Sequence, residues 1–178
     1  PAIIDEAMEP IMKPMAKAMM EEGHPFTGFL YGGLMLTDKG IKTIEFNARF
    51  GDPEAEVILP RLKSDFVEVI ENIMNHKTVE LTWDEEVTLG VVMASEGYPA
   101  SSTKGAVIKG FEDVDSMIFH MGTKEIDGNL VTDGGRVLIV VSKEKTLEEA
   151  YKKAYDDVEK ITCDKLFYRK DIGKKDMQ

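Results

Sequence analysis

The chain has 178 residues, of which 43% are hydrophobic and 31% charged, so it has enough apolar sequence for one large or two small domains and is not globally disordered. The chain contains 22 Lys and Arg and 33 Asp and Glu, which gives a formal net charge of −11. Such a chain has no general attraction to nucleic-acid phosphates, so we expect no nucleic-acid partner. Any anionic substrate must be held by a few local cations or by a metal ion.

The cysteine count and the apolar runs give expectations about location. Cys163 is the only cysteine, which excludes an intrachain disulfide and fits a reducing cytoplasm, where we expect the protein to act. No apolar run approaches the roughly 18 residues that span a bilayer, so no membrane association is expected. The first residue is Pro1 and not Met, which fits a cut end inside a longer polypeptide as well as a processed or engineered terminus.

The first element expected is a helix over residues 3–22, because apolar residues recur there at three- and four-residue steps. Pro10 and Pro14 each lack a backbone donor, so the helix should be bent or broken near them. Residues 26–36 and 41–47 then have the composition of two strands, and the turn signal Asp-Lys-Gly between them predicts a β-hairpin.

A second helix is predicted to start at Ser64-Asp65 and to end near residues 75–77. The polar stretch 77–86 is expected to be a linker. From residue 87 the chain is rich in strand patterns, and a capping box at Thr146 opens one more helix to about residue 160. The expected strands of this part cover residues 87–94, 105–109, 116–121, 130–132, 136–141 and 167–168.

Glu45 and Asn47 lie two residues apart on the second expected strand, so their side chains point to the same face. Mg²⁺ prefers oxygen ligands and takes only one or two from protein, with water and substrate phosphates supplying the rest. A carboxylate and a neutral amide oxygen suit this requirement, because they hold the ion without cancelling all of its charge. Arg49 follows on the same face if the strand continues, and its guanidinium can pair with a phosphate.

The bare pattern Glu-x-Asn-x-Arg is also compatible with an ordinary polar strand face that carries a salt-bridging arginine. The surrounding sequence favours the metal site. The run at residues 45–54, Glu-Phe-Asn-Ala-Arg-Phe-Gly-Asp-Pro-Glu, closely resembles the signature of the phosphoribosylamine–glycine ligase family, which belongs to the ATP-grasp superfamily. Further segments resemble landmarks of that family in the same order, at residues 29–36, 59–65, 97–99, 134–137 and 167–173.

The resemblance implies roles for individual residues. Glu45 and Asn47 would bind Mg²⁺ or Mn²⁺, and Arg49 would contact the transferred phosphate or a glycyl phosphate intermediate. Met35 would contact the adenine of ATP, and Asp52 would support the active-site loop, although an Asp before Pro is also a common turn residue. Many ATP-grasp relatives carry another metal carboxylate on the preceding strand. By spacing, that place falls near Gly33, so this site would have fewer protein ligands.

The resemblance also implies a fold and a reaction. We expect an α+β chain: the carboxy-terminal half of an ATP-grasp fold over residues 1–76, a linker over 77–86, and a small β-rich, barrel-sandwich-like domain with one helix over 87–178. The implied partners are ATP, glycine and 5-phosphoribosylamine, joined in purine biosynthesis, together with a missing amino-terminal half of the enzyme.

Because an ATP-grasp site lies between two halves, the isolated chain is expected to be inactive. Two alternatives stay open: a non-catalytic nucleotide-binding or assembly module on the same fold, and a different ATP-grasp ligase.

Overall fold

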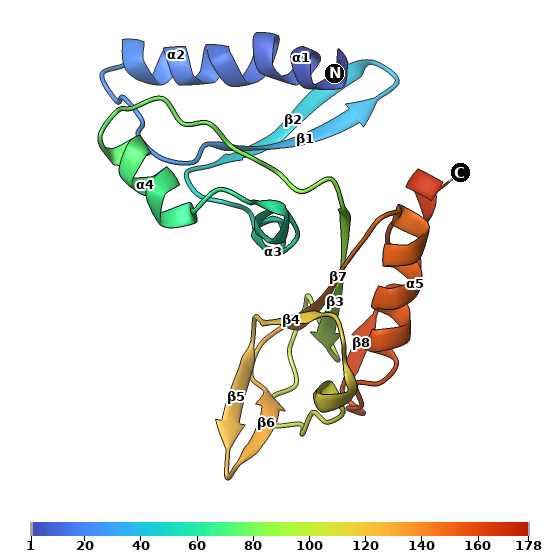
Figure 1. The fold of residues 1–178 in the computed structure, drawn as a ribbon. Coiled ribbons are helices and arrows are strands. Elements are labelled where there is room, and N and C mark those ends of the chain that lie inside the picture. Colours follow the sequence, from blue (N-terminus) through green and yellow to red (C-terminus); the bar gives the residue numbers. More distant parts are fainter. Residues whose placement is uncertain (1, 178) are drawn as a thin grey trace. The chain divides into compact units, whose positions relative to one another are not determined.

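A computed structural model describes residues 2–177 (Figure 1), so Pro1 and the question of its origin lie outside the described residues. The chain forms two compact units. The first unit runs to Gly51 and also contains Ser64–Leu81, whereas the second contains Asp52–Lys63 and the chain from Thr82 onward. The division into domains at 1–76 and 87–178 remains a prediction. The two units show that residues 52–63 pack with the later half of the chain.

The first unit opens with an irregular helix. It consists of α1 (Ala2–Ala7), a π-helical segment (Met8–Met12) and α2 (Lys13–Glu21). Pro10 lies inside the π-helical segment and Pro14 lies in the first turn of α2, and neither has a backbone N–H to donate. The predicted helix and its interruption near the prolines are both confirmed. Gly23, with φ of 79°, follows its end.

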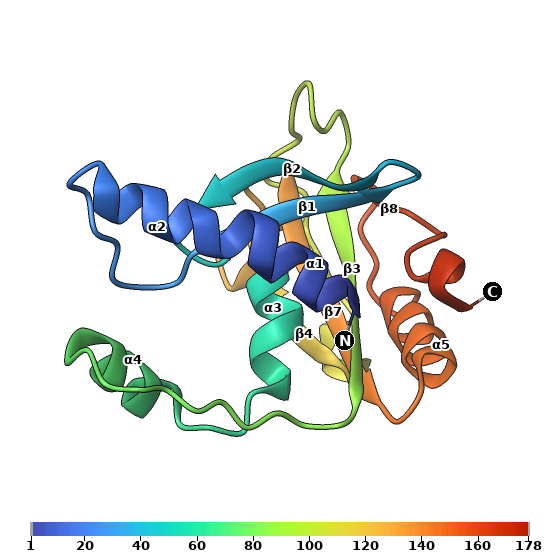
Figure 2. The ribbon, with the colours of Figure 1, turned by 90° about the horizontal axis from the view of Figure 1, so that it is seen from above.

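An antiparallel hairpin follows, formed by β1 (Tyr31–Thr37) and β2 (Gly40–Asn47). The hairpin is confirmed, although its first strand begins at Tyr31 and not at residue 26. The helical segment lies along one face of the hairpin in both views (Figures 1 and 2). The contact is close, because a Cβ added to Gly32 would lie 2.6 Å from the Sδ atom of Met12. Glycine at this position therefore lets the helix approach the strand.

The last helix of the first unit is α4 (Phe66–Met74). The Asp65 carboxylate caps it by accepting hydrogen bonds from the backbone N–H groups of Val67 and Glu68, as the sequence predicted. An aromatic cluster fixes this helix to the end of the hairpin region. The ring of Phe29 lies 4.5 Å from that of Phe50 and 5.7 Å from that of Phe66, measured between centroids.

The second unit is built on an antiparallel sheet with strand order β4-β7-β3-β8. Its strands are β3 (Val87–Ser95), β4 (Met117–His120), β7 (Arg136–Glu144) and β8 (Leu166–Tyr168), and β5 (Thr123–Ile126) pairs with β6 (Asn129–Thr132) in a separate hairpin. The prediction of a strand at 105–109 is wrong, because this stretch forms only isolated bridges at Val107 and Lys109. Strand β5 was not predicted. Short 3-10 helices lie at Leu59–Arg61, Phe111–Asp113 and Lys174–Met177.

Each face of this sheet is covered by a helix, α5 (Leu147–Val158) on one side and the short α3 (Glu54–Ile58) on the other (Figure 2). The α5 face holds the main core, which includes Val91, Leu138 and Val140. On the α3 face, a Cβ on Gly90 would lie within 2.7 Å of side-chain atoms of Val57 and Ile139. Within the described part of residues 87–178, α5 is the one α-helix, and segment 52–63, from outside that range, adds α3 to the second unit.

The described residues thus form a mixed α/β chain with antiparallel sheets and few helices. Within residues 2–177, none of the helices combines the length and the apolar character that crossing a membrane requires.

A buried carboxylate ties α5 to the start of β4. Asp157 is 2% exposed and accepts hydrogen bonds from the Lys160 ammonium at 2.7 Å and from the Ser116 backbone N–H at 2.8 Å. Burial alone would raise the pKa of the Asp157 carboxyl, but these hydrogen bonds outweigh it and hold the pKa below its ordinary value of 3.8. The charged form of Asp157 is therefore the form that stabilises the fold.

We expect the chain to lose stability in acid partly through Asp157. Because its pKa is lower in the folded than in the unfolded state, its contribution is complete above the unfolded-state value of about 4 and is lost as the pH falls toward the folded-state pKa. Thermal unfolding of Asp157→Asn, followed by circular dichroism, should show a lower Tm near neutral pH and a shallower fall of Tm in acid. The control is Asp156→Asn, at an exposed neighbour; equal pH slopes for wild type and Asp157→Asn would contradict this role.

Candidate active site

The predicted carboxylate–amide pair lies at the end of β2. Asn47 is the last residue of this strand, and its Nδ2 atom donates a hydrogen bond to Oε1 of Glu45 at 2.8 Å. The contact requires both side chains to point to the same side of the strand, which confirms the geometry inferred from their spacing. Glu45 is exposed and Asn47 is half-buried, so the pair is accessible from the surface of its unit.

The hairpin register places this pair on the face opposite the helix. Gly32, which contacts the helix through Met12, pairs with Phe46, so Glu45 and Asn47 on either side of Phe46 point away from the helix. Met35, whose side chain is 54% exposed, is two residues from Gly33, the partner of Glu45. Strand alternation therefore puts Met35 on the same face as the carboxylate–amide pair.

Gly33 lies directly opposite Glu45 in the ladder. A Cβ added to Gly33 would lie 3.0 Å from Cγ of Glu45, closer than ordinary van der Waals contact. This is the place where many ATP-grasp enzymes were expected, from the resemblance, to carry a further carboxylate. The glycine leaves the space above the Glu45 side chain open.

The donor set suits a hard divalent cation. One carboxylate and one amide oxygen, two residues apart on an exposed strand face, provide the small number of oxygen ligands that Mg²⁺ takes from proteins. Phosphate oxygens and water would complete the coordination shell. The residues present therefore fit Mg²⁺ or Mn²⁺ once the Asn47 amide turns, because its Nδ2 atom and not its oxygen faces Glu45 in this structure.

The expected position of Arg49 needs correction. Strand β2 ends at Asn47 because its partner Tyr31 is the first residue of β1, and Arg49 therefore has no opposite residue to pair with. Arg49 lies in a bend, and its Nη1 atom donates a hydrogen bond to the carbonyl of Phe50 at 2.7 Å. Strand alternation thus does not bring its exposed guanidinium onto the face of the pair.

Asp52 belongs to the second unit, just before Pro53 and α3. Arg136, the first residue of β7, donates a hydrogen bond from Nη1 to the Asp52 carbonyl at 2.6 Å and lies 3.2 Å from the Asp52 carboxylate. The pairing with Asp52 was missed, because no local pattern links residues so far apart.

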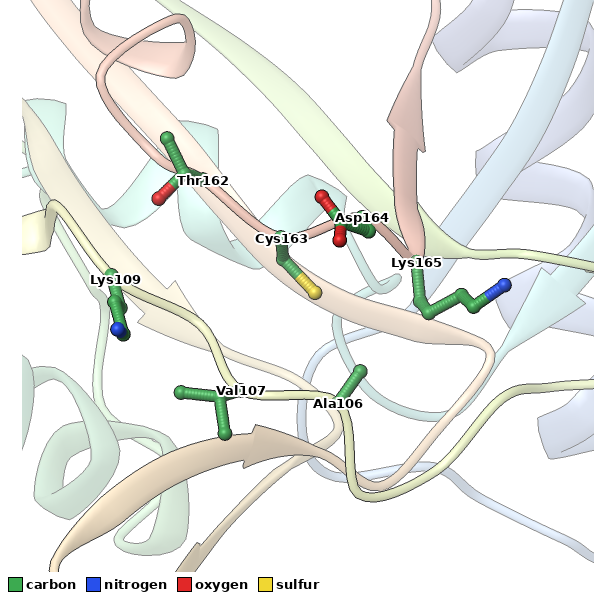
Figure 3. Close-up of a pocket in the computed structure, with 7 residues that line it drawn as sticks. All are labelled: Ala106, Val107, Lys109, Thr162, Cys163, Asp164 and Lys165. Atoms are coloured by element: carbon green, nitrogen blue, oxygen red, sulfur yellow. The ribbon is translucent and has the colours of Figure 1, made fainter.

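The second unit also contains a cavity of about 450 Å³ between residues 106–109 and 162–165 (Figure 3). The Cys163 thiol points into it from one wall, toward the segment that carries Ala106 and Val107. The ammonium of Lys165, on the same wall, pairs with Glu96 at 2.7 Å, and this hydrogen bond raises its pKa. The cavity is lined by no residue of the signature at 45–54.

Comparison with known family models assigns the class of protein to which the chain belongs. A family model described as the phosphoribosylglycinamide synthetase ATP-grasp (A) domain matches residues 1–55, and one described as the C domain of the same synthetase matches residues 88–175. The first match contains Glu45, Asn47 and Asp52, so the carboxylate–amide pair lies inside an ATP-grasp sequence.

Curated relatives identify the family. The chain is 52% identical over 174 residues to the phosphoribosylamine–glycine ligase of Halalkalibacterium halodurans, covering 97% of this chain and 41% of the relative. It is 45% identical to the enzyme of the same name from Listeria innocua, covering 97% of this chain and 42% of the relative. The crystal structure of phosphoribosylamine–glycine ligase from Thermotoga maritima matches 97% of this chain and 44% of its own, with a TM-score of 0.83 and 36% identity.

The chain belongs to the phosphoribosylamine–glycine ligase family, and it spans less than half the length of the curated relatives that it matches.

The carboxylate–amide pair predicts divalent-cation binding that depends on Glu45. Titration of the isolated chain with Mn²⁺, followed by the electron paramagnetic resonance signal of free Mn²⁺, should show a site that Glu45→Gln weakens by about tenfold or more. Gly33→Ala should weaken it as well, because the added Cβ displaces the Glu45 side chain. Glu68→Gln, at an exposed position in α4, is the control. Equal Mn²⁺ binding by all four proteins would refute the assignment.

Proposed function

We propose that this chain is the carboxy-terminal part of an ATP-dependent carbon–nitrogen ligase of purine biosynthesis. The complete enzyme would join glycine to 5-phosphoribosylamine, converting ATP to ADP and phosphate and producing glycinamide ribonucleotide. The observation that carries the proposal is the Glu45–Asn47 pair, joined by a 2.8 Å hydrogen bond on the exposed face of the hairpin, within a segment that matches the family's ATP-grasp model. Relatives that bear the ligase name support the substrate assignment.

In this proposal, the first unit and the β-rich second unit correspond to the second half of an ATP-grasp fold and to a barrel-sandwich-like domain. Glu45 and Asn47 hold Mg²⁺ or Mn²⁺, which supplies positive charge to the phosphates of ATP. The neutral amide of Asn47 leaves more of that charge available than a second carboxylate would. Met35, on the same face, offers an apolar surface to adenine.

Arg49 and Asp52 have different roles in the proposed reaction. Glycyl phosphate forms when a glycine carboxylate oxygen attacks the terminal phosphorus of ATP and ADP leaves. The ribosylamine nitrogen then attacks the acyl carbon and phosphate leaves. Arg49 stabilises the transferred phosphate, which requires its guanidinium to leave the Phe50 carbonyl. Asp52 supports the segment that carries Arg49.

A non-catalytic binding module on the same fold is the second candidate, and a different ATP-grasp ligase is the third. Glu45, Asn47 and Arg49 are all present, which favours an active parent enzyme over a module that has lost its chemistry. The C-domain match over residues 88–175 favours glycine ligation over another ATP-grasp reaction, because that model describes this synthetase specifically.

The test is an ADP-release assay with ATP, Mg²⁺, glycine and freshly prepared 5-phosphoribosylamine. We expect no turnover by the chain alone and turnover when it is mixed with the amino-terminal portion of the same enzyme. Glu45→Ala should abolish the activity of the mixture, with a loss of at least about a hundredfold, since an interaction with the reacting phosphates is removed. Glu68→Ala should retain it.

Turnover by the chain alone would overturn the expectation that it is incomplete. A mixture that forms a complex but releases no ADP would count against the ligase proposal, and would favour the binding module. ADP release that does not depend on glycine would instead point to a different ATP-grasp reaction.

A further inference from the structure

The direction of the Arg136 side chain is set by a β-bulge. The pairing of β3 with β7 shifts between Met93 and Ala94: Met93 is opposite Leu138, whereas Ala94 is opposite Arg136. Val137 is therefore the extra residue, and it joins the buried core beside Leu138 on the α5 face.

Without this bulge, Arg136 would be on the wrong face for Asp52. In a regular strand, Arg136 would share the α5 face with Leu138, since residues two apart point the same way. Its actual partner, Ala94, is four residues from Gly90, which faces α3. The bulge thus transfers the guanidinium to the face that carries α3 and the residue Asp52 before it.

At Asp52 the guanidinium makes two contacts through one atom. Nη1 donates to the backbone carbonyl at 2.6 Å and lies 3.2 Å from Oδ1 of the carboxylate. Arg136 therefore fixes the main chain of Asp52 as well as its side chain. The backbone before Arg136 is itself held, because the Gly134 carbonyl accepts from the Ser95 hydroxyl at 2.8 Å and the Gly135 carbonyl accepts from the Ser95 backbone N–H at 2.8 Å.

Two further contacts hold the rest of the segment at 52–63. The Thr88 hydroxyl donates to the Val57 carbonyl at 2.6 Å, and the Lys143 ammonium donates to the Pro60 carbonyl at 3.2 Å. All three donors lie on β3 or β7, and all three acceptors are backbone carbonyls. The contact from Arg136 is the first of these along the segment. Its acceptor, Asp52, lies three residues after Arg49 in the chain.

We propose that Arg136 is a positioning residue for the signature at residues 45–54. Directed by the bulge, its guanidinium clamps Asp52 and so holds in place the chain segment that follows Arg49. This inference rests on the proposed ligase function for its catalytic consequence, whereas the clamp itself can be tested in the isolated chain. Phe50 is held by the aromatic cluster of the first unit and Asp52 by Arg136. Only Gly51 lies between these two residues, so the contact that Arg136 makes lies three residues from Arg49 in the chain.

The clamp is tested by hydrogen exchange of the backbone amides at residues 50–56 in the isolated chain. Arg136→Ala should accelerate exchange there by about tenfold, the effect of losing a hydrogen bond from a charged donor. Arg136→Lys should restore part of the protection, because an ammonium keeps the charge but is a different shape. Lys104→Ala removes an exposed ion pair of the same 3.2 Å length, to Asp133, and is the matched control. Unchanged exchange in Arg136→Ala would overturn the clamp.

The positioning role is tested in the mixture with the amino-terminal portion. Arg136→Ala should lower kcat by about ten- to a hundredfold, as a small misplacement of a catalytic group does, with little change in the KM for ATP. Mn²⁺ binding by the isolated chain should stay at the wild-type level, because the hairpin holds Glu45 and Asn47 without Arg136.

In the double variant with Asp52→Asn, the loss of kcat should be smaller than the product of the two single losses, since the Asp52 carboxylate is one of the two groups that Arg136 contacts. Fully multiplicative losses, or a wild-type kcat in Arg136→Ala, would overturn the positioning role. If the wild-type mixture forms a complex but shows no ligase activity, the proposed function and the positioning role in catalysis both fail, and hydrogen exchange still decides whether the clamp exists.

Discussion

The register of the β1–β2 hairpin is the constraint on which the candidate site depends. Tyr31 pairs with Asn47 and Gly33 with Glu45, so the carboxylate and the amide point to one face and Phe46 to the other. A slip of a single residue would turn both polar side chains toward the helix and expose Phe46. The packing of Met12 over Gly32 fixes the face of β1 that the helix covers, because only glycine admits the helix at this distance, and the register then sets which side chains of β2 lie on that face. The contact between helix and hairpin thus determines which side chains face solvent.

A second constraint acts at the other end of the signature. The β-bulge at the start of β7 removes Arg136 from the core face and gives that place to Val137. The bulge therefore resolves a conflict in the sequence, in which a charged residue occupies a position that strand alternation would direct toward α5. Bulges that redirect a side chain in this way occur often beside functional sites. Here the redirected residue contacts the last part of the signature through its backbone.

Local patterns in the sequence were sufficient for much of this structure. The helix interrupted at Pro10, the hairpin, the Asp65 cap and the opening of α5 at Thr146 were predicted because each depends on residues a few positions apart. The same is true of the Glu45–Asn47 pair. Strand β5 was missed because it pairs only with its neighbour β6 and carries a weak strand pattern.

The remaining features could not be derived from local patterns. Arg49 leaves the strand because β1 begins at Tyr31, a boundary that the sequence placed five residues earlier. The Arg136–Asp52 contact joins residues 84 positions apart and depends on a bulge without a clear signal of its own. The packing of segment 52–63 on the sheet likewise arises from tertiary contacts, whereas the sequence favoured one continuous first domain.

That packing has a consequence for how the polypeptide acquires its structure during synthesis. Helix α3 and its flanking residues emerge from the ribosome well before β3 and β7, the strands that they cover. Because the chain folds from its amino terminus as it is made, residues 52–63 remain without their sheet until residue 144 has been translated. In the meantime the apolar side chains of Val57 and Ile58 are exposed to other nascent chains and to chaperones. The sheet is assembled from strands that are far apart in the sequence. Folding of the second unit is therefore a late, long-range event.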